Sequence, residues 1–204
     1  MFDSGISVKN LIDELKNTEV DIALEIPNAT YVTWLNALQQ LLYTEVIKEQ
    51  KKITLYGSLS GKVSITSIPT ENGENRPRFE DIYTIYADGK QLIKTTVASG
   101  AVFLDTFYKN GNDICFNTVF MPGELTIVYF VKPALVTVTD DDHINDANVM
   151  VPIEFIDLVK SKLRGEAYKL ANEDGIAAKW LNDYNILLET FKAWIADKSS
   201  NFGM

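Results

Sequence analysis

The hydrophobic residues of this chain repeat with a helical period at both ends and with a strand period in the middle. Up to residue 52 apolar side chains recur every three or four positions, whereas from residue 53 to residue 139 they tend to alternate with polar ones. Helical spacing returns after Pro152. Because these two periods are typical of amphipathic helices and of strands, the order helix, strand, helix predicts a fold of the α+β class.

Two helices are predicted in an N-terminal helical segment, residues 1–52. Ser7 is a suitable N-cap for a short first helix, whose apolar face begins with Val8. A second helix is expected over residues 31–48, with Asn28 or Thr30 as its cap. The apolar stripe of this second helix consists of Tyr31, Trp34, Leu35, Leu38, Leu41, Leu42 and Val46.

Residues 53–139 predict an antiparallel β module, either a small sandwich or a barrel. Asp88-Gly89 and Asn110-Gly111 each separate two strand patterns, and both dipeptides tolerate the positive φ angles of a tight two-residue hairpin turn. A longer apolar strand over 125–131 stops at Pro133, and residues 135–138 are expected to extend it along an edge of the sheet.

An acidic loop, residues 140–150, separates the β module from a C-terminal antiparallel helical hairpin, residues 151–204. Pro152 suits the first turn of a helix that runs to about residue 171, and Asn172, Asp174 and Gly175 interrupt the helical pattern. The last helix has an aromatic stripe, which makes it either part of the core or a surface for oligomer and partner contacts. The candidate interface residues are Trp180, Tyr184, Phe191 and Trp194.

The charge balance argues against electrostatic binding to nucleic acid or to an anionic membrane. The chain has 28 acidic and 19 basic residues, a net charge of −9, and such binding requires a basic surface. Its single cysteine, Cys115, excludes an intrachain disulfide, and its apolar neighbours indicate a packed strand residue. The N-terminus lacks signal-peptide features, so we expect a protein made in the cytoplasm without membrane association.

No catalytic, cofactor-binding or metal-binding motif stands out. The lone histidine, His143, lies in the acidic loop, and residues 57–61 place Leu59 where a nucleophile elbow needs its nucleophile. The acidic loop has aspartates that suit calcium but lacks the EF-hand pattern, so a solvated loop is favoured. Adjacent carboxylates, Glu80 and Asp81, offer only a weak case for acid–base catalysis. We therefore expect a protein that is not an enzyme and that needs no cofactor.

The order of parts resembles that of the head-to-tail adaptor, or connector, proteins of tailed bacteriophages. Short N-terminal helices precede a β module, and a helical hairpin ends the chain. Locally, the resemblance lies in the strand 125–131 with Tyr129, in Lys132-Pro133 before the aspartate-rich loop, and in Val151-Pro152 at the start of the hairpin. Further residues that carry it are Ala167, Tyr168 and the helix from Ala177 to Tyr184 and beyond.

The resemblance implies a non-enzymatic structural protein of the virion. Members of that family form homo-oligomeric rings, commonly twelvefold, that dock beneath the portal protein and join it to the next neck or tail protein. DNA passes through the ring without specific binding, and a negatively charged conduit suits that passage. Localisation at the head–tail junction follows from this interpretation.

Two alternatives remain open at this point. In the first alternative to the adaptor, the protein is another neck or tail component of the same kind of virion. In the second, it is a monomeric ligand-binding sandwich of the carbohydrate-binding type. The second alternative needs aromatic side chains on one exposed sheet face, whereas packing in the core explains the same residues equally simply. The residues concerned are Tyr83, Tyr86, Phe103, Phe107 and Tyr108.

Overall fold

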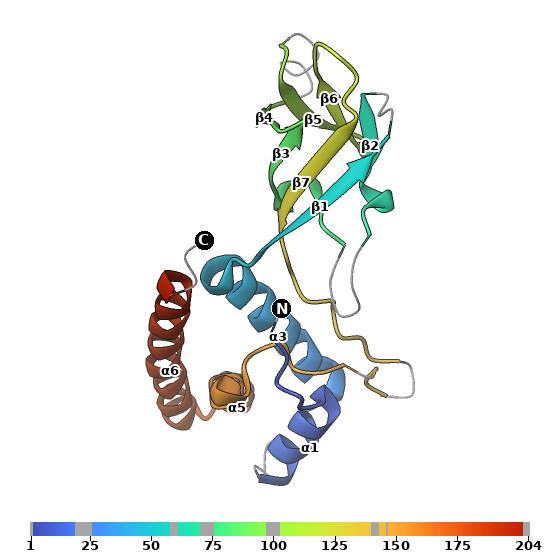
Figure 1. Cartoon of the computed structure of the whole chain (residues 1–204). Helices are drawn as coiled ribbons and strands as arrows, with labels where there is room; N and C mark the ends of the chain where they lie inside the picture. Colours follow the sequence, from blue (N-terminus) through green and yellow to red (C-terminus); the bar gives the residue numbers. More distant parts are fainter. Residues whose placement is uncertain are drawn as a thin grey trace. The chain divides into compact units, whose positions relative to one another are not determined.

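The chain forms two compact units in the computed structural model (Figure 1). The structure describes residues 2–18, 26–57, 61–69, 76–96, 103–139, 143–145 and 147–201. Unit 1 comprises residues 1–47 and 135–204, and unit 2 comprises residues 48–134. The α+β class is confirmed. The N-terminal helices and the C-terminal hairpin, which the sequence places at opposite ends of the chain, belong to the same unit.

Unit 1 is helical and begins with α1 (Val8–Thr18) and α3 (Asn28–Leu41). The predicted cap of α1 is confirmed, because the backbone N–H of Asn10 donates to Ser7 Oγ over 3.1 Å. The predicted cap of α3 is wrong: Pro27 occupies the N-cap position, and no side-chain bond caps the helix. The fixed φ of proline suits a helix start and replaces the expected polar cap.

The end of α3 continues directly into a π-helical segment, η1 (Leu42–Ile47). Leu42 and Tyr43 are buried there, so the wider turn keeps this end of the helix packed against unit 1. Lys48 then adopts a left-handed conformation, with φ of 49°. Such a residue ends a helix because its backbone no longer follows the helical path. The helical pattern predicted over residues 31–48 is therefore found, but in two geometries.

Backbone pairing joins the N-terminal segment to the segment that precedes the C-terminal hairpin. The N–H of Ser4 donates to Val149 O, and the N–H of Val149 donates to Ile6 O. In addition, the side-chain amide of Asn36 in α3 forms two hydrogen bonds, of 2.8 and 2.9 Å, with the carbonyl and N–H of Val136. These contacts, between residues 100 to 145 positions apart in the sequence, join the two chain segments that make up unit 1.

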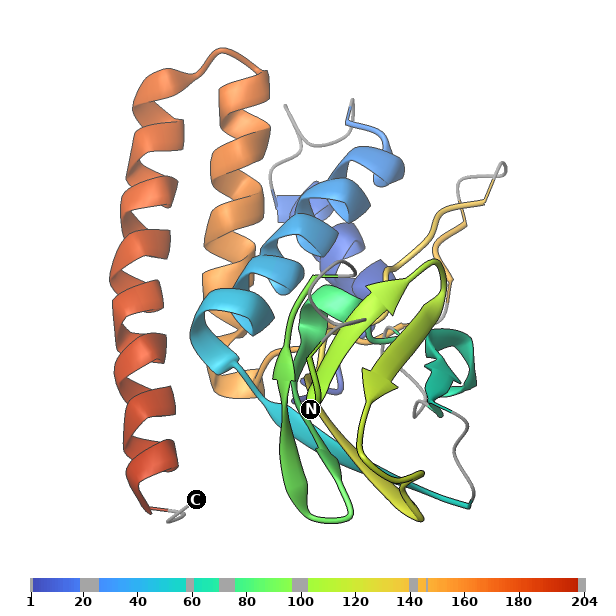
Figure 2. The same cartoon turned by 90° about the horizontal axis from the view of Figure 1, so that it is seen from above.

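The C-terminal hairpin consists of α5 (Ile156–Leu170) and α6 (Asp174–Asn201), preceded by the short 3₁₀-helix η4 (Ile153–Phe155). Figure 2 shows the two helices side by side and antiparallel, as predicted. The break lies at residues 171–173, where Asn172 has φ of 61°. Asp174 and Gly175, which we expected in the break, form the first turn of α6.

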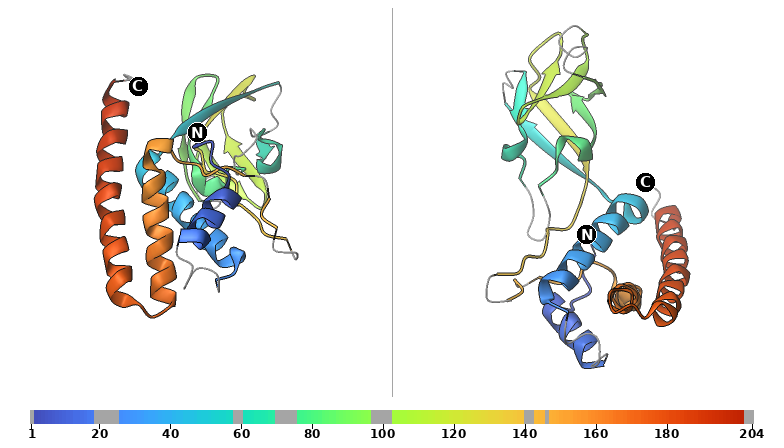
Figure 3. Two further views of the ribbon diagram at one scale, coloured as in Figure 1. Left: turned by 90° about the horizontal axis from the view of Figure 1, so that it is seen from below. Right: turned by 180° about the vertical axis from the view of Figure 1, so that it is seen from behind.

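Helix α5 lies between the N-terminal helices and α6, as both views of Figure 3 show. Its buried residues therefore occupy two sides of the helix rather than one, and Ser161 and Gly165 are among them. A Cβ atom at Gly165 would lie only 2.6 Å from Leu181 Cδ2 of α6, so the absence of a side chain permits this close approach. Leu170, predicted on the apolar face, is 57% exposed.

Unit 2 is built on a curled, mixed sheet of seven strands, counted over the described residues, in the order β1-β7-β3-β4-β5-β6-β2. The described strands form six pairs of hydrogen-bonded neighbours. Five of these pairs are antiparallel, and the pair of β4 and β5 is parallel. This parallel pair is not anticipated by the all-antiparallel prediction. The strands are β1 (Gln50–Tyr56), β2 (Lys62–Ser64), β3 (Ile82–Ala87), β4 (Lys90–Lys94), β5 (Thr106–Asn110), β6 (Asp113–Asn117) and β7 (Glu124–Phe130).

Both predicted hairpins are present, and one has a different turn. Ala87 pairs with Lys90, so Asp88-Gly89 is the two-residue turn, with φ of 47° and 79°. In the second hairpin Asn110 pairs with Asp113, and the turn is therefore Gly111 and Asn112, one residue later than predicted. Glycine at the first turn position provides the positive φ that this turn needs, 62° at Gly111.

The expected edge strand over residues 135–138 is wrong. The segment has only an isolated bridge between Val138 and Ile144, and Val136 packs in the core of unit 1. Asn36 binds the backbone polar groups of Val136, so this residue needs no neighbouring strand to satisfy them.

Candidate interaction surfaces

Two of the four aromatic residues predicted to form an interface lie in the core of unit 1. Phe191 is fully buried, and Tyr184 is 8% exposed. Burial also raises the pKa of the Tyr184 phenol, because the ionised form would lose its hydration. Both residues lie on the face of α6 that packs on the rest of unit 1, so they are not available to a partner.

Trp194 is partly buried within an aromatic cluster. Its ring lies 5.3 Å from that of Phe155 and 5.7 Å from that of Phe2, and it stacks at 6.1 Å on Phe191. Lys198 Nζ lies 4.2 Å from the Trp194 centroid. These contacts fix the C-terminal half of α6 on unit 1, and they make a structural role the simplest explanation of Trp194.

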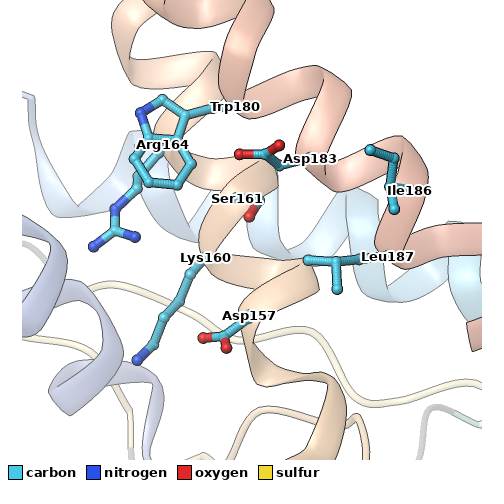
Figure 4. A pocket seen from close by; sticks show the side chains of 8 residues that line it. All are labelled: Asp157, Lys160, Ser161, Arg164, Trp180, Asp183, Ile186 and Leu187. Carbon is cyan, nitrogen blue, oxygen red and sulfur yellow. The ribbon is translucent and has the colours of Figure 1, made fainter. Parts of the chain in front are cut away.

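Trp180 is the member of the predicted set that borders a surface groove. The groove lies between α5 and α6 and has a volume of about 470 Å³. Figure 4 shows the Trp180 ring beside the Arg164 side chain, whose guanidinium carbon lies 4.7 Å from the ring centroid. Trp180, Ile186 and Leu187 provide the apolar part of the lining, so the groove offers a desolvating surface for apolar groups.

The cations of this groove are already engaged, whereas its carboxylates are available. Lys160 Nζ donates to Glu14 Oε1 of α1 over 2.6 Å, and Arg164 donates to Thr18 Oγ1 over 3.2 Å. Among the described residues, Asp157 and Asp183 have no ion-pair partner within 4.0 Å. The groove therefore combines an apolar lining with acidic acceptors.

A second surface, not predicted from the sequence, lies at one end of the unit 2 sheet. We call it the apolar tip. It is formed by the end of β1, by the residues before β5 and by the loop from β6 to β7, and Figure 1 shows that loop at the end of the sheet where β1 finishes. The residues of the apolar tip are Tyr56, Phe103, Leu104, Val119, Phe120 and Met121, with exposed fractions from 54% to 82%.

Hydrogen bonds hold the apolar tip in one conformation. The Thr118 hydroxyl donates to Phe120 O over 2.7 Å. The Asp88 carboxylate accepts from the N–H groups of Gly123 and Glu124, at 3.0 and 2.9 Å. On the other side, Asn117 Nδ2 donates to Phe103 O over 3.1 Å. An exposed apolar loop that is fixed in this way loses little conformational entropy when it binds.

The apolar tip has a signal in the sequence, but hydrophobic periodicity does not detect it. Val119, Phe120 and Met121 are three consecutive apolar residues placed directly before Pro122-Gly123. Connections between strands are normally polar, and a run of exposed apolar residues in one of them indicates a functional surface. Alternation alone does not find it, because the run has no period.

The carboxylates considered for catalysis form ion pairs in unit 2. Asp81 is buried and contacts Lys132 Nζ at 2.5 Å and Arg78 Nε at 3.6 Å. Glu80 is exposed and pairs with Lys109 at 3.4 Å. A backbone hydrogen bond, together with Lys109, lowers the pKa of Glu80, which keeps it ionised at neutral pH. This arrangement suits fold stabilisation rather than proton donation.

The other residues singled out for chemistry are dispersed. His143 lies in an isolated bridge region, where its carbonyl accepts from the N–H of Thr139 over 2.9 Å. Asp140, Asp141, Asp142 and Asp146 are outside the described residues, as are residues 58–60 of the glycine-bounded turn. Within the described part of the chain, no three histidine, cysteine or carboxylate side chains gather closely enough to hold a metal ion.

Cys115 and the aromatic residues of the sheet have packing roles. Cys115 lies in β6, opposite Lys62 and Tyr108, and is partly buried. Burial raises the pKa of its thiol, and the nearby Asp113 carboxylate raises it further. Phe107 is fully buried, whereas Tyr83 is 58% exposed and packs edge-on against Phe130. Core packing is thus the correct interpretation for Phe107.

Comparison with known proteins gives no family assignment: no model of a protein family matches the chain, and no curated protein has a similar sequence. Among the helices of the described ranges, none combines the length and the apolar character needed to cross a bilayer.

Proposed function

We propose that this protein is a structural adaptor of a tailed-phage virion, which joins portal and tail as a homo-oligomeric ring through which DNA passes. The observation that carries the proposal is the apolar tip. A single protein chain rarely keeps such an exposed apolar patch rigid without a protein partner to cover it. The order of elements, with a β unit inserted between N-terminal helices and a C-terminal hairpin, supports the same proposal.

The division of charge between the units supports a role in DNA passage. Unit 2 contains 10 basic and 9 acidic residues and unit 1 contains 9 basic and 19 acidic residues, so their formal charges are +1 and −10. A strongly acidic surface does not retain phosphates. The acidic helical unit therefore lines the DNA channel, and the β unit contributes contacts with neighbouring proteins.

The first test is the sequence of the DNA that flanks the gene. Genes for terminase, portal and capsid on one side and for tail proteins on the other are the expected result, because structural genes of tailed phages usually lie in assembly order. Flanking genes for metabolism or secretion would contradict the proposal and would favour the ligand-binding module.

The second test is direct binding to the portal protein encoded at the same locus. The two purified proteins are mixed and separated by size-exclusion chromatography, and the complex is imaged by negative-stain electron microscopy. We expect a ring of this chain bound to one end of the portal. A portal that elutes alone at every ratio of the two proteins contradicts the adaptor function.

A further inference from the structure

We infer that the apolar tip of one copy docks into the groove between α5 and α6 of the next copy. This inference rests on the proposed function, because it names the surfaces by which the homo-oligomer assembles. The two surfaces belong to different parts of the chain, so the contact is head to tail. Contacts of that kind generate rings when the rotation between neighbours closes.

The area of the apolar tip fits a protein interface. The six residues, three of them aromatic with roughly 150–250 Å² each, are 54% to 82% exposed, and together they offer on the order of 800 Å². This is about the area that one partner contributes to a stable interface of standard size. Phe120 is 82% and Met121 71% exposed, and they are the natural anchors because aromatic residues and methionine are enriched in such interfaces.

The groove has matching chemistry. Its volume of about 470 Å³ accommodates large side chains, and Trp180, Ile186 and Leu187 provide apolar contacts for them. Ile186 is 59% exposed, so covering it removes further apolar surface from water. Lys160 is ion-paired with Glu14 of α1, so Asp157, Asp183 and Arg164 remain as the charged groups of the lining, and the two carboxylates outnumber the guanidinium.

Charge selects a head-to-tail contact over a symmetric contact between two helical units. Two copies of unit 1 would each bring a formal charge of −10, whereas unit 2 brings +1. Like charges oppose association and opposite charges favour it. Electrostatic repulsion between two copies is therefore weakest when unit 2 of one copy approaches unit 1 of the other.

The test compares self-association of the full chain with that of two surface variants by sedimentation velocity over a wide concentration range. The tip variant is Phe120→Asp/Met121→Asp, and the groove variant is Ile186→Glu. Loss of an interface anchor weakens association by at least about thirtyfold. The matched controls are Tyr83→Asp in unit 2 and Leu170→Glu in α5, which replace residues that are 58% and 57% exposed outside the two surfaces, and we expect them to associate as wild type.

Mixing the two variants distinguishes a head-to-tail contact from a symmetric one. The tip variant retains its groove and the groove variant retains its tip, so the mixture is expected to form dimers that cannot grow. A mixture that stays monomeric, or a groove variant that associates as wild type, overturns the inference. A wild-type chain that is monomeric and floats with phosphatidylcholine vesicles also overturns it, because the apolar tip would then bind a membrane and not a second copy. Oligomers that neither variant weakens also overturn it, but leave intact the adaptor function, which portal binding tests by itself.

Discussion

Close packing of α6 on Gly165 gives the sharpest test of the unit 1 structure. In the variant Gly165→Ala, the new Cβ would lie 2.6 Å from Leu181 Cδ2 and 2.7 Å from Leu181 Cγ. Alanine favours the helix by about 0.5–1 kcal/mol relative to glycine. Overpacking costs about 1–3 kcal/mol, and the Cγ contact cannot be relieved by a terminal methyl alone. We expect a net destabilisation of about 1–2 kcal/mol.

The assay is urea denaturation of the full chain, followed by tryptophan fluorescence. The chain has three tryptophans, and Trp34, Trp180 and Trp194 all belong to unit 1, so the signal reports that unit alone. Gly175→Ala is the matched control. A Cβ at Gly175 in the first turn of α6 meets no atom within 4 Å, so this variant should be stabilised by up to about 0.5–1 kcal/mol.

A double-mutant cycle identifies the cause of the effect. If Leu181 is the obstacle, Leu181→Ala should offset most of the cost of Gly165→Ala, with a coupling energy of about 1–2 kcal/mol. A Gly165→Ala variant as stable as Gly175→Ala would refute the close approach of α5 and α6. Additive effects of the two substitutions would refute the role of Leu181.

Three further outcomes are expected. Asp81→Ala leaves Lys132, whose side chain is 15% exposed, without its carboxylate and should destabilise unit 2 by about 3 kcal/mol, measured by thermal unfolding followed by circular dichroism; an unchanged midpoint contradicts a buried ion pair. Asn36→Ala removes both hydrogen bonds to the Val136 backbone and should cost about 2 kcal/mol, with faster amide exchange at Val136 as the specific readout. Burial raises the pKa of Cys115 above 9.0, the usual value for a thiol. Just above pH 9.0 the folded chain therefore keeps the thiol proton, whereas the unfolded chain loses it. Its contribution to stability is therefore complete below that value and is lost as pH rises through the higher folded-state pKa, and thiol labelling of the native chain at pH 8 should be slower than labelling of the unfolded chain.

Local patterns accounted for most individual elements. The Asp88-Gly89 turn was predictable because two positive φ angles are required between adjacent strands and this dipeptide tolerates them. Ser7 was predictable as a cap because its hydroxyl satisfies a free N–H of the first helical turn. The Pro27 start of α3 was not, because two local signals, a proline and a polar residue, competed for the same position.

The candidate surfaces were harder to predict than the elements. Aromatic character singled out Trp180, which borders the groove, but it also singled out Phe191, which is fully buried. Sequence spacing shows that both residues belong to one helix, but not which face of that helix is covered by other elements. Val119, Phe120 and Met121 have a recognisable composition, yet only their exposure in the folded unit makes them a candidate binding surface.

The sequence by itself determined the helical ends, the β-rich middle and the acidic balance of this protein, because periodicity, turn chemistry and charge depend on neighbouring residues. The tertiary structure alone decided that residues 1–47 and 135–204 form one unit, that β4 and β5 run parallel, and that α6 packs closely on Gly165. These features depend on contacts between residues far apart in the chain, and the energy of such contacts is set by packing and burial rather than by local pattern.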